Sequence, residues 1–271
     1  MPEKTVTRSR EPSSLSRFYL ILFNGISGMG WTYVLFLAMS TLFDPSNAVK
    51  YDSLDYLNPI LPYIKPVSQS TNQISASIAS LLRQYIPSVY SSTFFALLPV
   101  QSLAILEVVH VLLGLVRSPL PTTLMQVSSR LFCVWAIVVR YPATHTNPIY
   151  TTMISAWALT EVPRYMFYMI SLMGVEPPKA LVWLRYSTFY ILYPLGASSE
   201  AFLMLSTIPE WANNAWVSWA PEDYVRAGLF CIWWPGLYAM YSHMMQQRRK
   251  VLGTGKGRKL GGKPKNRVKA D

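Results

Sequence analysis

The sequence predicts an all-α membrane protein, built as a bundle of about six transmembrane helices. Hydrophobic residues make up 51% of the 271-residue chain and charged residues only 14%, whereas soluble domains average about 25% charged residues. Long apolar stretches recur along the chain, and basic residues are distributed unevenly among the segments that connect them. These observations exclude an ordinary soluble globular domain.

Six segments are long and apolar enough to cross a bilayer, which takes roughly 20 residues of helix. The third and fourth are interrupted by Arg130, Glu161 and Arg164. Because charges at such depth are costly in lipid, we expect these side chains to face the inside of the bundle. The expected spans are 18–43, 93–116, 123–140, 148–173, 181–207 and 225–245.

The distribution of charge predicts that both termini are cytosolic. Basic residues cluster in the N-terminal segment 1–17 and in the C-terminal segment 247–271, and Arg117 and Lys179 flank two further connections. The alternate connections, including the long one at 44–92, are neutral or acidic. The positive-inside rule therefore places both ends of the chain in the cytosol, which requires an even number of spans.

Residues 18–246 are expected to form one membrane domain, with 44–92 as a non-cytosolic loop that contains a short amphipathic helix near 73–86. The net charge of +11 belongs mainly to the C-terminal tail, because 248–271 holds ten of the 24 basic residues and one of the 13 acidic ones. We expect 247–271 to be disordered and attracted to anionic lipid head groups rather than to nucleic acid. Its last residues, RVKAD, resemble a retrieval signal of endoplasmic-reticulum membrane proteins.

The cysteines and histidines predict neither a disulfide framework nor a metal site. Cys133 and Cys231 both lie in apolar segments. Glu107 and His110 would be neighbours on one helix face, but the chain has only three histidines, too few for a histidine-rich di-metal centre. We therefore expect this pair to serve as an internal ion-pair or hydrogen-bond partner for a buried arginine.

Charged side chains recur inside the predicted spans, and two interpretations of them stay open. They could neutralise one another and lock the helices together, or buried arginines could orient a carboxylate and hold a thioester or phosphate-bearing substrate. Their number favours a polar cavity between the helices. The residues are Glu107, Arg130, Glu161, Arg164, Arg185 and Glu200.

The fifth span contains the pair of side chains best suited to acid–base chemistry. Tyr193 and Glu200 are seven residues apart, two helical turns, and would lie on one face. Undistorted, they would be about 10 Å apart along the axis. Pro194 and Gly196 between them can distort the helix and shorten that separation. A phenol and a carboxylate on one face indicate proton transfer on a lipid-like substrate.

With these residues in view, the chain resembles the membrane-bound (3R)-3-hydroxyacyl-CoA dehydratase family, also described as protein tyrosine phosphatase-like. The resemblance covers about 103–244 and is carried by the stretches LEVVHVLLGLVRSP, TTLMQVSSRL, WALTEVPRYMFY and LRYSTFYILYPLGASSE. It implies the third step of very-long-chain fatty-acid elongation in the endoplasmic reticulum, where water is removed from 3-hydroxyacyl-CoA to give trans-2-enoyl-CoA.

The same resemblance implies roles for individual residues. The catalytic tyrosine and glutamate of the family fall on Tyr193 and Glu200. No cofactor is implied, and the implied partners are the elongase, the ketoacyl-CoA reductase and the enoyl-CoA reductase. Other polar or glycine positions of the family fall on Glu107, Gln126, Arg130, Arg164, Arg185 and Gly196.

The expected mechanism takes Glu200 as the base for the C2 proton and Tyr193 as the donor to the departing C3 hydroxyl, although the two roles could be exchanged. Because Tyr193 would lie deep in the bilayer, we expect a cavity open to the cytosol and lined by basic residues such as Arg117 or Arg185. The alternatives are a non-catalytic scaffold of the elongation machinery and a small-solute transporter, which would show internal repeats.

Overall fold

The computed structural model describes residues 13–44, 73–83, 86–209 and 217–252, and throughout this part of the chain the regular structure is helical. Most elements are α-helices, while η3 is a π-helix and η4 a short 3₁₀ helix. In chain order they are α1 Ser14–Phe43, α2 Gln73–Arg83, α3 Tyr90–Ser102, α4 Ile105–Leu112, α5 Leu120–Leu131, η3 Phe132–Val138, η4 Pro142–Thr144, α6 Pro148–Leu172, α7 Lys179–Ser187, α8 Phe189–Leu205 and α9 Pro221–Leu252.

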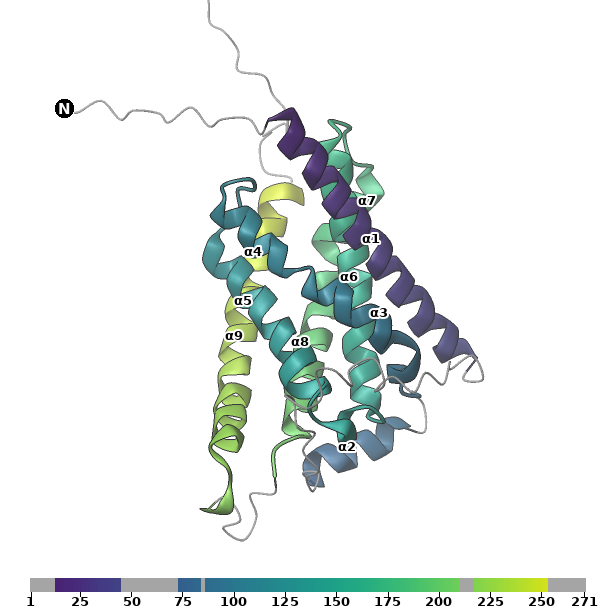
Figure 1. Ribbon diagram of the computed structural model, residues 1–271, viewed down its shortest axis with the longest axis vertical. Coiled ribbons are helices and arrows are strands. Elements are labelled where there is room, and N and C mark those ends of the chain that lie inside the picture. Colours follow the sequence, from purple (N-terminus) through teal and green to yellow (C-terminus); the bar gives the residue numbers. More distant parts are fainter. Residues whose placement is uncertain (1–12, 45–72, 84–85, 210–216, 253–271) are drawn as a thin grey trace, which may run out of the picture.

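These helices form six long rods in the described part of the chain, together with the short α2 (Figure 1). Helix α3 continues into α4 after two residues, α5 runs directly into η3, and only Thr188 separates α7 from α8. Each rod coincides with one of the segments expected to cross the bilayer. The all-helical class is confirmed, while the assignment of all six rods as membrane spans stays a prediction.

Helix α6 lies at the centre and packs against α1, α8, α7 and α2, while α9 packs against α8 and α7. Side chains from several rods share one apolar core. The first turn of α1 and the last turn of α9 lie at the same, upper end of the molecule in Figure 1. Fully buried members of the core include Trp31, Val34, Phe94, Leu97, Val134, Met153 and Trp157.

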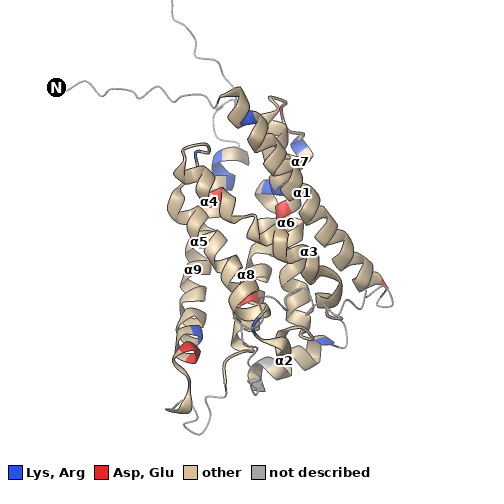
Figure 2. Cartoon of the chain, viewed as in Figure 1, with Lys and Arg blue, Asp and Glu red and all other residues tan. Residues whose placement is uncertain are grey.

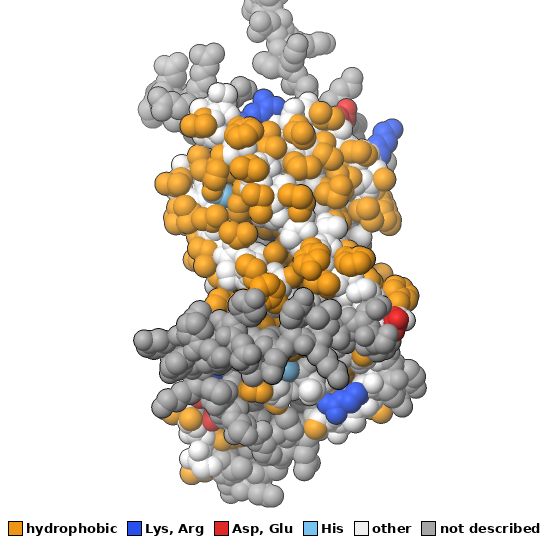
Figure 3. Space-filling view, turned by 45° about the vertical axis from the view of Figure 1, so that its right-hand side comes forward, with side chains coloured by type: hydrophobic (Ala, Val, Ile, Leu, Met, Phe, Trp, Pro, Cys, Tyr) orange, Lys and Arg blue, Asp and Glu red, His pale blue; other side chains and the backbone are white. Residues whose placement is uncertain are grey.

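The surface of the rods is apolar over a broad area, as Figure 3 shows for one face. On α1 alone Phe18, Leu22, Met29 and Phe36 are exposed. Soluble monomers rarely expose patches of this kind. Two helical stretches, Ser14–Phe43 and Tyr90–Leu112, are long and apolar enough to cross a membrane. These features agree with a membrane protein.

The ends of several elements differ from the sequence expectation. Helix α1 begins at Ser14, because the Ser13 side chain caps it by accepting from the Ser16 amide. Helix α9 continues to Leu252, so residues 247–252, expected in the disordered tail, are helical. Glutamine, arginine and lysine are good helix formers, which explains the extension.

The expected amphipathic helix of the long connection is present as α2, Gln73–Arg83, where Ala79 is buried and Ile78 and Leu82 pack against the core. Helix α3 then begins at Tyr90, inside the range expected to be loop. The remaining expectations for this connection, 45–72, and for the tail, 253–271, lie outside the described residues.

Glycines let α1 approach its neighbours closely. A Cβ at Gly30 would lie 2.6 Å from Cγ2 of Val100 on α3, and one at Gly28 would lie 3.4 Å from Cβ of Tyr165 on α6. At Gly228 on α9 an added Cβ would meet nothing within 4 Å. The contact between α1 and α3 therefore depends on the absence of a side chain at Gly30.

Gly30→Ala should lower the stability of the protein by about 1–3 kcal/mol, the usual cost of overpacking a filled contact. Gly228→Ala is the matched control and should be neutral or stabilising by up to about 1 kcal/mol, because alanine is the better helix former. The apparent melting temperature in detergent measures both changes. Equal melting temperatures for the two variants would contradict the close approach of α1 and α3.

Candidate active site

Tyr193 and Glu200 both lie on α8, which forms one helix from Phe189 to Leu205 despite Pro194 in its interior. Glu200 is buried, with 7% of its surface exposed, and Tyr193 is partly buried. The charges of Glu200 and of Arg130 both act on the Tyr193 phenol. The two predicted catalytic side chains therefore share one electrostatic environment, although no direct hydrogen bond joins them among the contacts of the described residues.

Two tryptophans lie against the Glu200 carboxylate. Trp157 Nε1 on α6 donates to Glu200 Oε1 at 2.7 Å, and the indole of Trp233 on α9 lies close to the same carboxylate. Trp157 is itself almost completely buried. Neither tryptophan is predicted as a site residue from the sequence, because an indole within an apolar span usually serves as core packing, and no spacing rule connects Trp157 or Trp233 to Glu200.

Arg130 lies between the carboxylate and the neighbouring ion pairs. It is the last basic residue of α5, just before the π-helical turn η3, and π-helical turns are frequent at functional sites. Its guanidinium lies 5.2 Å from the ring centroid of Trp157 and is ion-paired to Glu161. The charge of Arg130 also acts on Glu200. Arg130 thus lies between the Glu200 carboxylate, which accepts from Trp157, and the ion pairs that Glu161 forms.

The remaining charges form a continuous network between α4, α5 and α6. Arg164 Nε donates to Glu161 Oε2 at 2.5 Å, and its two terminal nitrogens donate to both oxygens of Glu107 at 2.9 and 2.6 Å. Tyr165 Oη donates to Glu107 Oε1 at 2.5 Å. Figure 2 shows how sparse charged residues are along the rods, so this network is a concentrated feature. The interpretation that these charges neutralise one another is confirmed for Arg130, Glu161, Arg164 and Glu107.

Glu200 differs from the other two carboxylates of this region in its partners. Glu107 and Glu161 are each ion-paired to arginine, whereas within the described ranges Glu200 has no ion-pair partner and accepts from the neutral indole of Trp157. A carboxylate bound bidentately by arginine is a poor proton acceptor. Glu200 is therefore the carboxylate of this region that no arginine neutralises in an ion pair.

The other predicted site residues occupy different surroundings. Arg185 on α7 donates to Tyr168 Oη at 2.8 Å, and its guanidinium lies 4.2 Å from the Tyr168 ring centroid and 4.5 Å from that of Phe167. Gln126 is exposed on α5, one turn before Arg130, and lies outside the ion-pair network. The structure thus brings together Glu107, Arg130, Glu161, Arg164 and Glu200, but not Gln126 or Arg185.

Gly196 gives α8 room beside the tryptophan. A Cβ at this position would lie 3.6 Å from Cδ1 of Trp157 and 3.5 Å from Cβ of Ala156. These are ordinary contacts, so alanine fits, while a larger side chain would displace the indole that donates to Glu200. Gly196 therefore supports the site through packing.

Glu107 pairs with an arginine as expected from the sequence, through Arg164. The same expectation is wrong for His110, which contacts a tyrosine instead. Its Nε2 lies 2.9 Å from Tyr19 Oη on α1, and its ring packs edge-on against Phe23 at 4.7 Å between centroids. In the described part of the chain no three His, Cys, Asp or Glu side chains come together in a metal-binding group.

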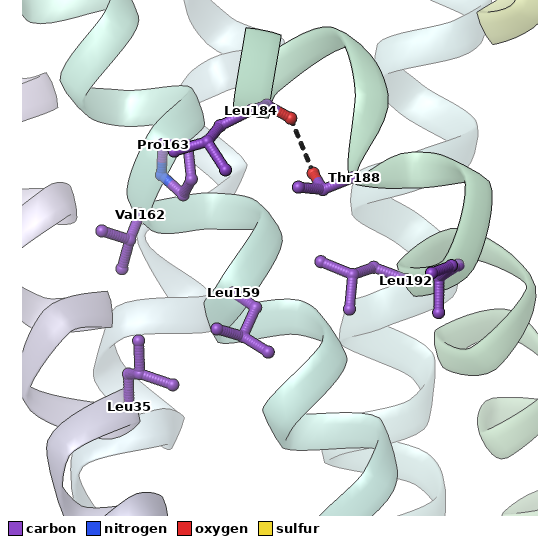
Figure 4. Close-up of a pocket in the computed structure, with 8 residues that line it drawn as sticks. Leu35, Leu159, Val162, Pro163, Leu184, Thr188 and Leu192 are labelled. Carbon is purple, nitrogen blue, oxygen red and sulfur yellow. Dashed lines mark hydrogen bonds between the residues drawn. The ribbon is translucent and has the colours of Figure 1, made fainter. Parts of the chain in front are cut away.

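A pocket of about 410 Å³ lies between α1, α6, α7 and α8 (Figure 4). Its walls are apolar except for Thr188, whose hydroxyl donates to the Leu184 carbonyl at 2.8 Å. Tyr193 and Glu200 are not among its lining residues, so this pocket is not the cytosol-connected cavity expected from the sequence, and that cavity stays a prediction. The pocket is lined by Leu35, Leu159, Val162, Pro163, Leu184, Thr188, Ile191 and Leu192.

The region that carries this site matches a known protein family. Residues 101–254 match the family model described as protein tyrosine phosphatase-like protein, PTPLA. The chain is 46% identical over 155 residues to a probable very-long-chain (3R)-3-hydroxyacyl-CoA dehydratase of Schizosaccharomyces pombe, covering 56% of this chain and 71% of that protein.

Two further relatives extend the match. The chain is 30% identical over 253 residues to the rice dehydratase PASTICCINO 2B, which covers 90% of this chain and 97% of the relative. It is 36% identical over 183 residues to the dehydratase hpo-8 of Caenorhabditis elegans, with 64% of this chain and 84% of the relative covered. No solved structure gives a significant match. The chain therefore belongs to the protein tyrosine phosphatase-like, PTPLA, family.

Proposed function

We propose that this protein is a very-long-chain (3R)-3-hydroxyacyl-CoA dehydratase, a hydro-lyase that converts 3-hydroxyacyl-CoA into trans-2-enoyl-CoA. Relatives that align with most of the chain are named for this activity. The observation that carries the assignment to this site is the buried Glu200 carboxylate, which accepts from the neutral indole of Trp157 and whose charge acts on the Tyr193 phenol.

The proposed mechanism uses these two side chains without a cofactor. The thioester acidifies the C2 hydrogen, and Glu200 removes it as a proton. The electron pair of the C2–H bond forms the C2–C3 double bond, and the C3–O bond breaks. Tyr193 donates its proton to the departing oxygen, which leaves as water. Transfer of the proton from Glu200 back to the phenolate restores the site.

The ion-pair network has a supporting role in this mechanism. Glu161 and Glu107 keep Arg130 and Arg164 in place, and Arg130 stacks over Trp157. Because charge changes at Glu200 and Tyr193 during turnover, a fixed cation nearby stabilises the developing negative charge without reorganising. Arg130 is the cation that acts on both side chains.

We further propose that all six rods cross the endoplasmic-reticulum membrane, with both termini in the cytosol, and that the protein works beside the elongase, the ketoacyl-CoA reductase and the enoyl-CoA reductase. The common location of the α1 start and the α9 end supports this topology. Chain-length preference would follow from the apolar space available to the acyl chain.

Incubation of the purified full-length protein with (3R)-3-hydroxyacyl-CoA tests the proposed activity. Mass spectrometry should detect trans-2-enoyl-CoA at a rate proportional to the protein concentration. The non-catalytic scaffold alternative predicts no product above the protein-free control, and that result would refute the assignment.

Trp157→Phe should lower kcat about tenfold and leave KM nearly unchanged, because it removes one donor that orients Glu200 but keeps an aromatic ring in the core. Trp31→Phe is the matched control: Trp31 packs edge-on against Trp157 at 6.5 Å between centroids and is buried to the same degree. It should retain normal kcat. In a Glu200→Gln background, Trp157→Phe should lower kcat little further. If instead the two changes lowered kcat by independent factors, a positioning role for Trp157 would be contradicted.

A further inference from the structure

Helices α8 and α9 run antiparallel and form a continuous contact along the side of α8 that carries Glu200. Trp233 of α9 lies close to Glu200, and Tyr241 packs against Tyr190 at 6.2 Å between ring centroids. About two turns beyond Tyr241 along α9 lies Arg248. Glu200 and Tyr190 therefore both lie on the side of α8 that faces α9, and Tyr190 is closer to the start of α8.

Arg248 is held in place at the end of this contact. Its Nε donates to Ser187 Oγ of α7 at 3.3 Å, and its guanidinium lies 5.2 Å from the ring centroid of Tyr190. Both contacts leave the terminal nitrogens of the guanidinium available as donors. Within the described residues Arg248 has no carboxylate partner, whereas Arg130 and Arg164 are each bound to glutamate.

The other arginine expected to contact the substrate is engaged elsewhere. Arg185 donates to Tyr168 and lies against the rings of Phe167 and Tyr168, and its Nε and one terminal nitrogen are buried. Arg248 is followed by Arg249 and Lys250, which are exposed. Figure 2 shows this basic turn at the upper end of α9. The positive charge of Arg248 is thus held in place by Ser187 and Tyr190, and Arg249 and Lys250 add further positive charge next to it.

The distance between Ser187 and the catalytic pair matches the length of the pantetheine arm of the proposed CoA substrate. Along the helix, Ser187 lies about 9 Å from Tyr193 and about 20 Å from Glu200, so it is about 14 Å from the point midway between them. The pantetheine arm of CoA has about thirteen bonds between its sulfur and its first phosphorus, equivalent to about four extended residues, or roughly 14 Å. A thioester between Tyr193 and Glu200 would place that phosphate level with Ser187.

We propose that Arg248, held by Ser187 and Tyr190, binds a phosphate of the CoA moiety and thereby sets how far the thioester enters the bundle. This inference rests on the proposed dehydratase function and adds a phosphate-binding site to it. Arginine is suited to this role because its planar guanidinium can donate two parallel hydrogen bonds to phosphate. Phosphate on a lipid head group has the same chemistry, so the test separates the two sources.

The test compares Arg248→Gln with Arg249→Gln, which removes the same charge from the next, exposed position. The full-length proteins are purified in dodecyl maltoside micelles, which contain no phosphate, and assayed with a 3-hydroxyacyl-CoA and with the corresponding 3-hydroxyacyl-pantetheine, which has no phosphate. Arg248→Gln should raise KM for the CoA substrate roughly tenfold, with kcat retained, and should leave KM for the pantetheine substrate unchanged. Arg249→Gln should match the wild type on both substrates.

Three results would overturn the proposal. Equal increases in KM on both substrates would mean that Arg248 only supports helix packing, and equal increases in the two variants would indicate a general surface-charge effect. An effect that appears only after phosphatidylserine is added would assign Arg248 to lipid head groups.

Calorimetric binding of CoA and of pantetheine gives a second measurement that needs no turnover. Wild-type protein should bind CoA more tightly than pantetheine, and Arg248→Gln should weaken CoA binding about tenfold without affecting pantetheine. A protein that binds CoA through Arg248 but forms no enoyl product would refute the dehydratase function and leave this site standing. Equal CoA affinity in wild type and Arg248→Gln would refute the site alone.

Discussion

Glu200→Gln should reduce kcat for dehydration of 3-hydroxyacyl-CoA by about 10³-fold or more, and Tyr193→Phe by about 10²-fold or more, because each change removes one proton-transfer group. The amide that replaces the Glu200 carboxylate has nearly the same shape, and its oxygen can still accept from the indole of Trp157. The change at Tyr193 removes only the hydroxyl. Initial rates of enoyl-CoA formation at saturating substrate measure both losses, and KM should change little.

Matched controls separate lost chemistry from lost structure. Glu222→Gln removes a carboxylate at a partly exposed ion pair with Arg140, and Tyr238→Phe removes a hydroxyl from an exposed phenol on α9. Both should retain nearly wild-type kcat. Equal activity in wild type, Glu200→Gln and Tyr193→Phe would refute the assignment of the catalytic pair while leaving the family membership intact.

The second large effect concerns stability. Arg164→Gln should destabilise the protein by about 3–5 kcal/mol, because it leaves Glu107 without its ion-pair partner and removes one of the two arginines bound to Glu161. Glu161 is 3% exposed, so water cannot replace the lost donors. A large fall in the apparent melting temperature in detergent, together with loss of monodisperse protein, is the expected observation.

Arg140→Gln is the matched control for this change. Arg140 and Glu222 also form an ion pair, but each side chain is about one third exposed, and exposed pairs contribute about 0–1 kcal/mol. The double variant Glu107→Gln/Arg164→Gln should be more stable than the sum of the single changes predicts, because it removes both members of one pair. Similar melting temperatures for Arg164→Gln and Arg140→Gln would contradict the structural importance of the network.

Much of the helical organisation follows from local sequence. Spacing of apolar residues located every rod to within a few residues, because a stretch of roughly 20 apolar residues suits a helix across a bilayer. The pairing of Glu161 with Arg164 was also predictable, since residues three apart lie on one helix face, and the structure confirms it. Identification of the family came from motifs between Leu103 and Met244, and the comparisons confirm it.

Contacts between segments that are distant in the sequence were harder to predict. Nothing local to Arg164 indicates that it binds Glu107, 57 residues away, and nothing near Arg185 indicates its position among Phe167 and Tyr168. The sequence predicts the end of the last span near residue 245, whereas α9 continues to Leu252. In the structure the Arg248 side chain contacts Ser187 and Tyr190, and these tertiary contacts help keep the last turn ordered.

By itself the sequence determined the helical class, the family, and the two turns of helix that separate a phenol from a carboxylate, because these depend on composition and on the fixed rise of an α-helix. Only the tertiary structure decided which charges neutralise one another and which carboxylate lacks an arginine. The physical reason is that a side chain's chemistry depends on its surroundings, and the indoles of Trp157 and Trp233 reach Glu200 from α6 and α9, which the chain brings together only on folding.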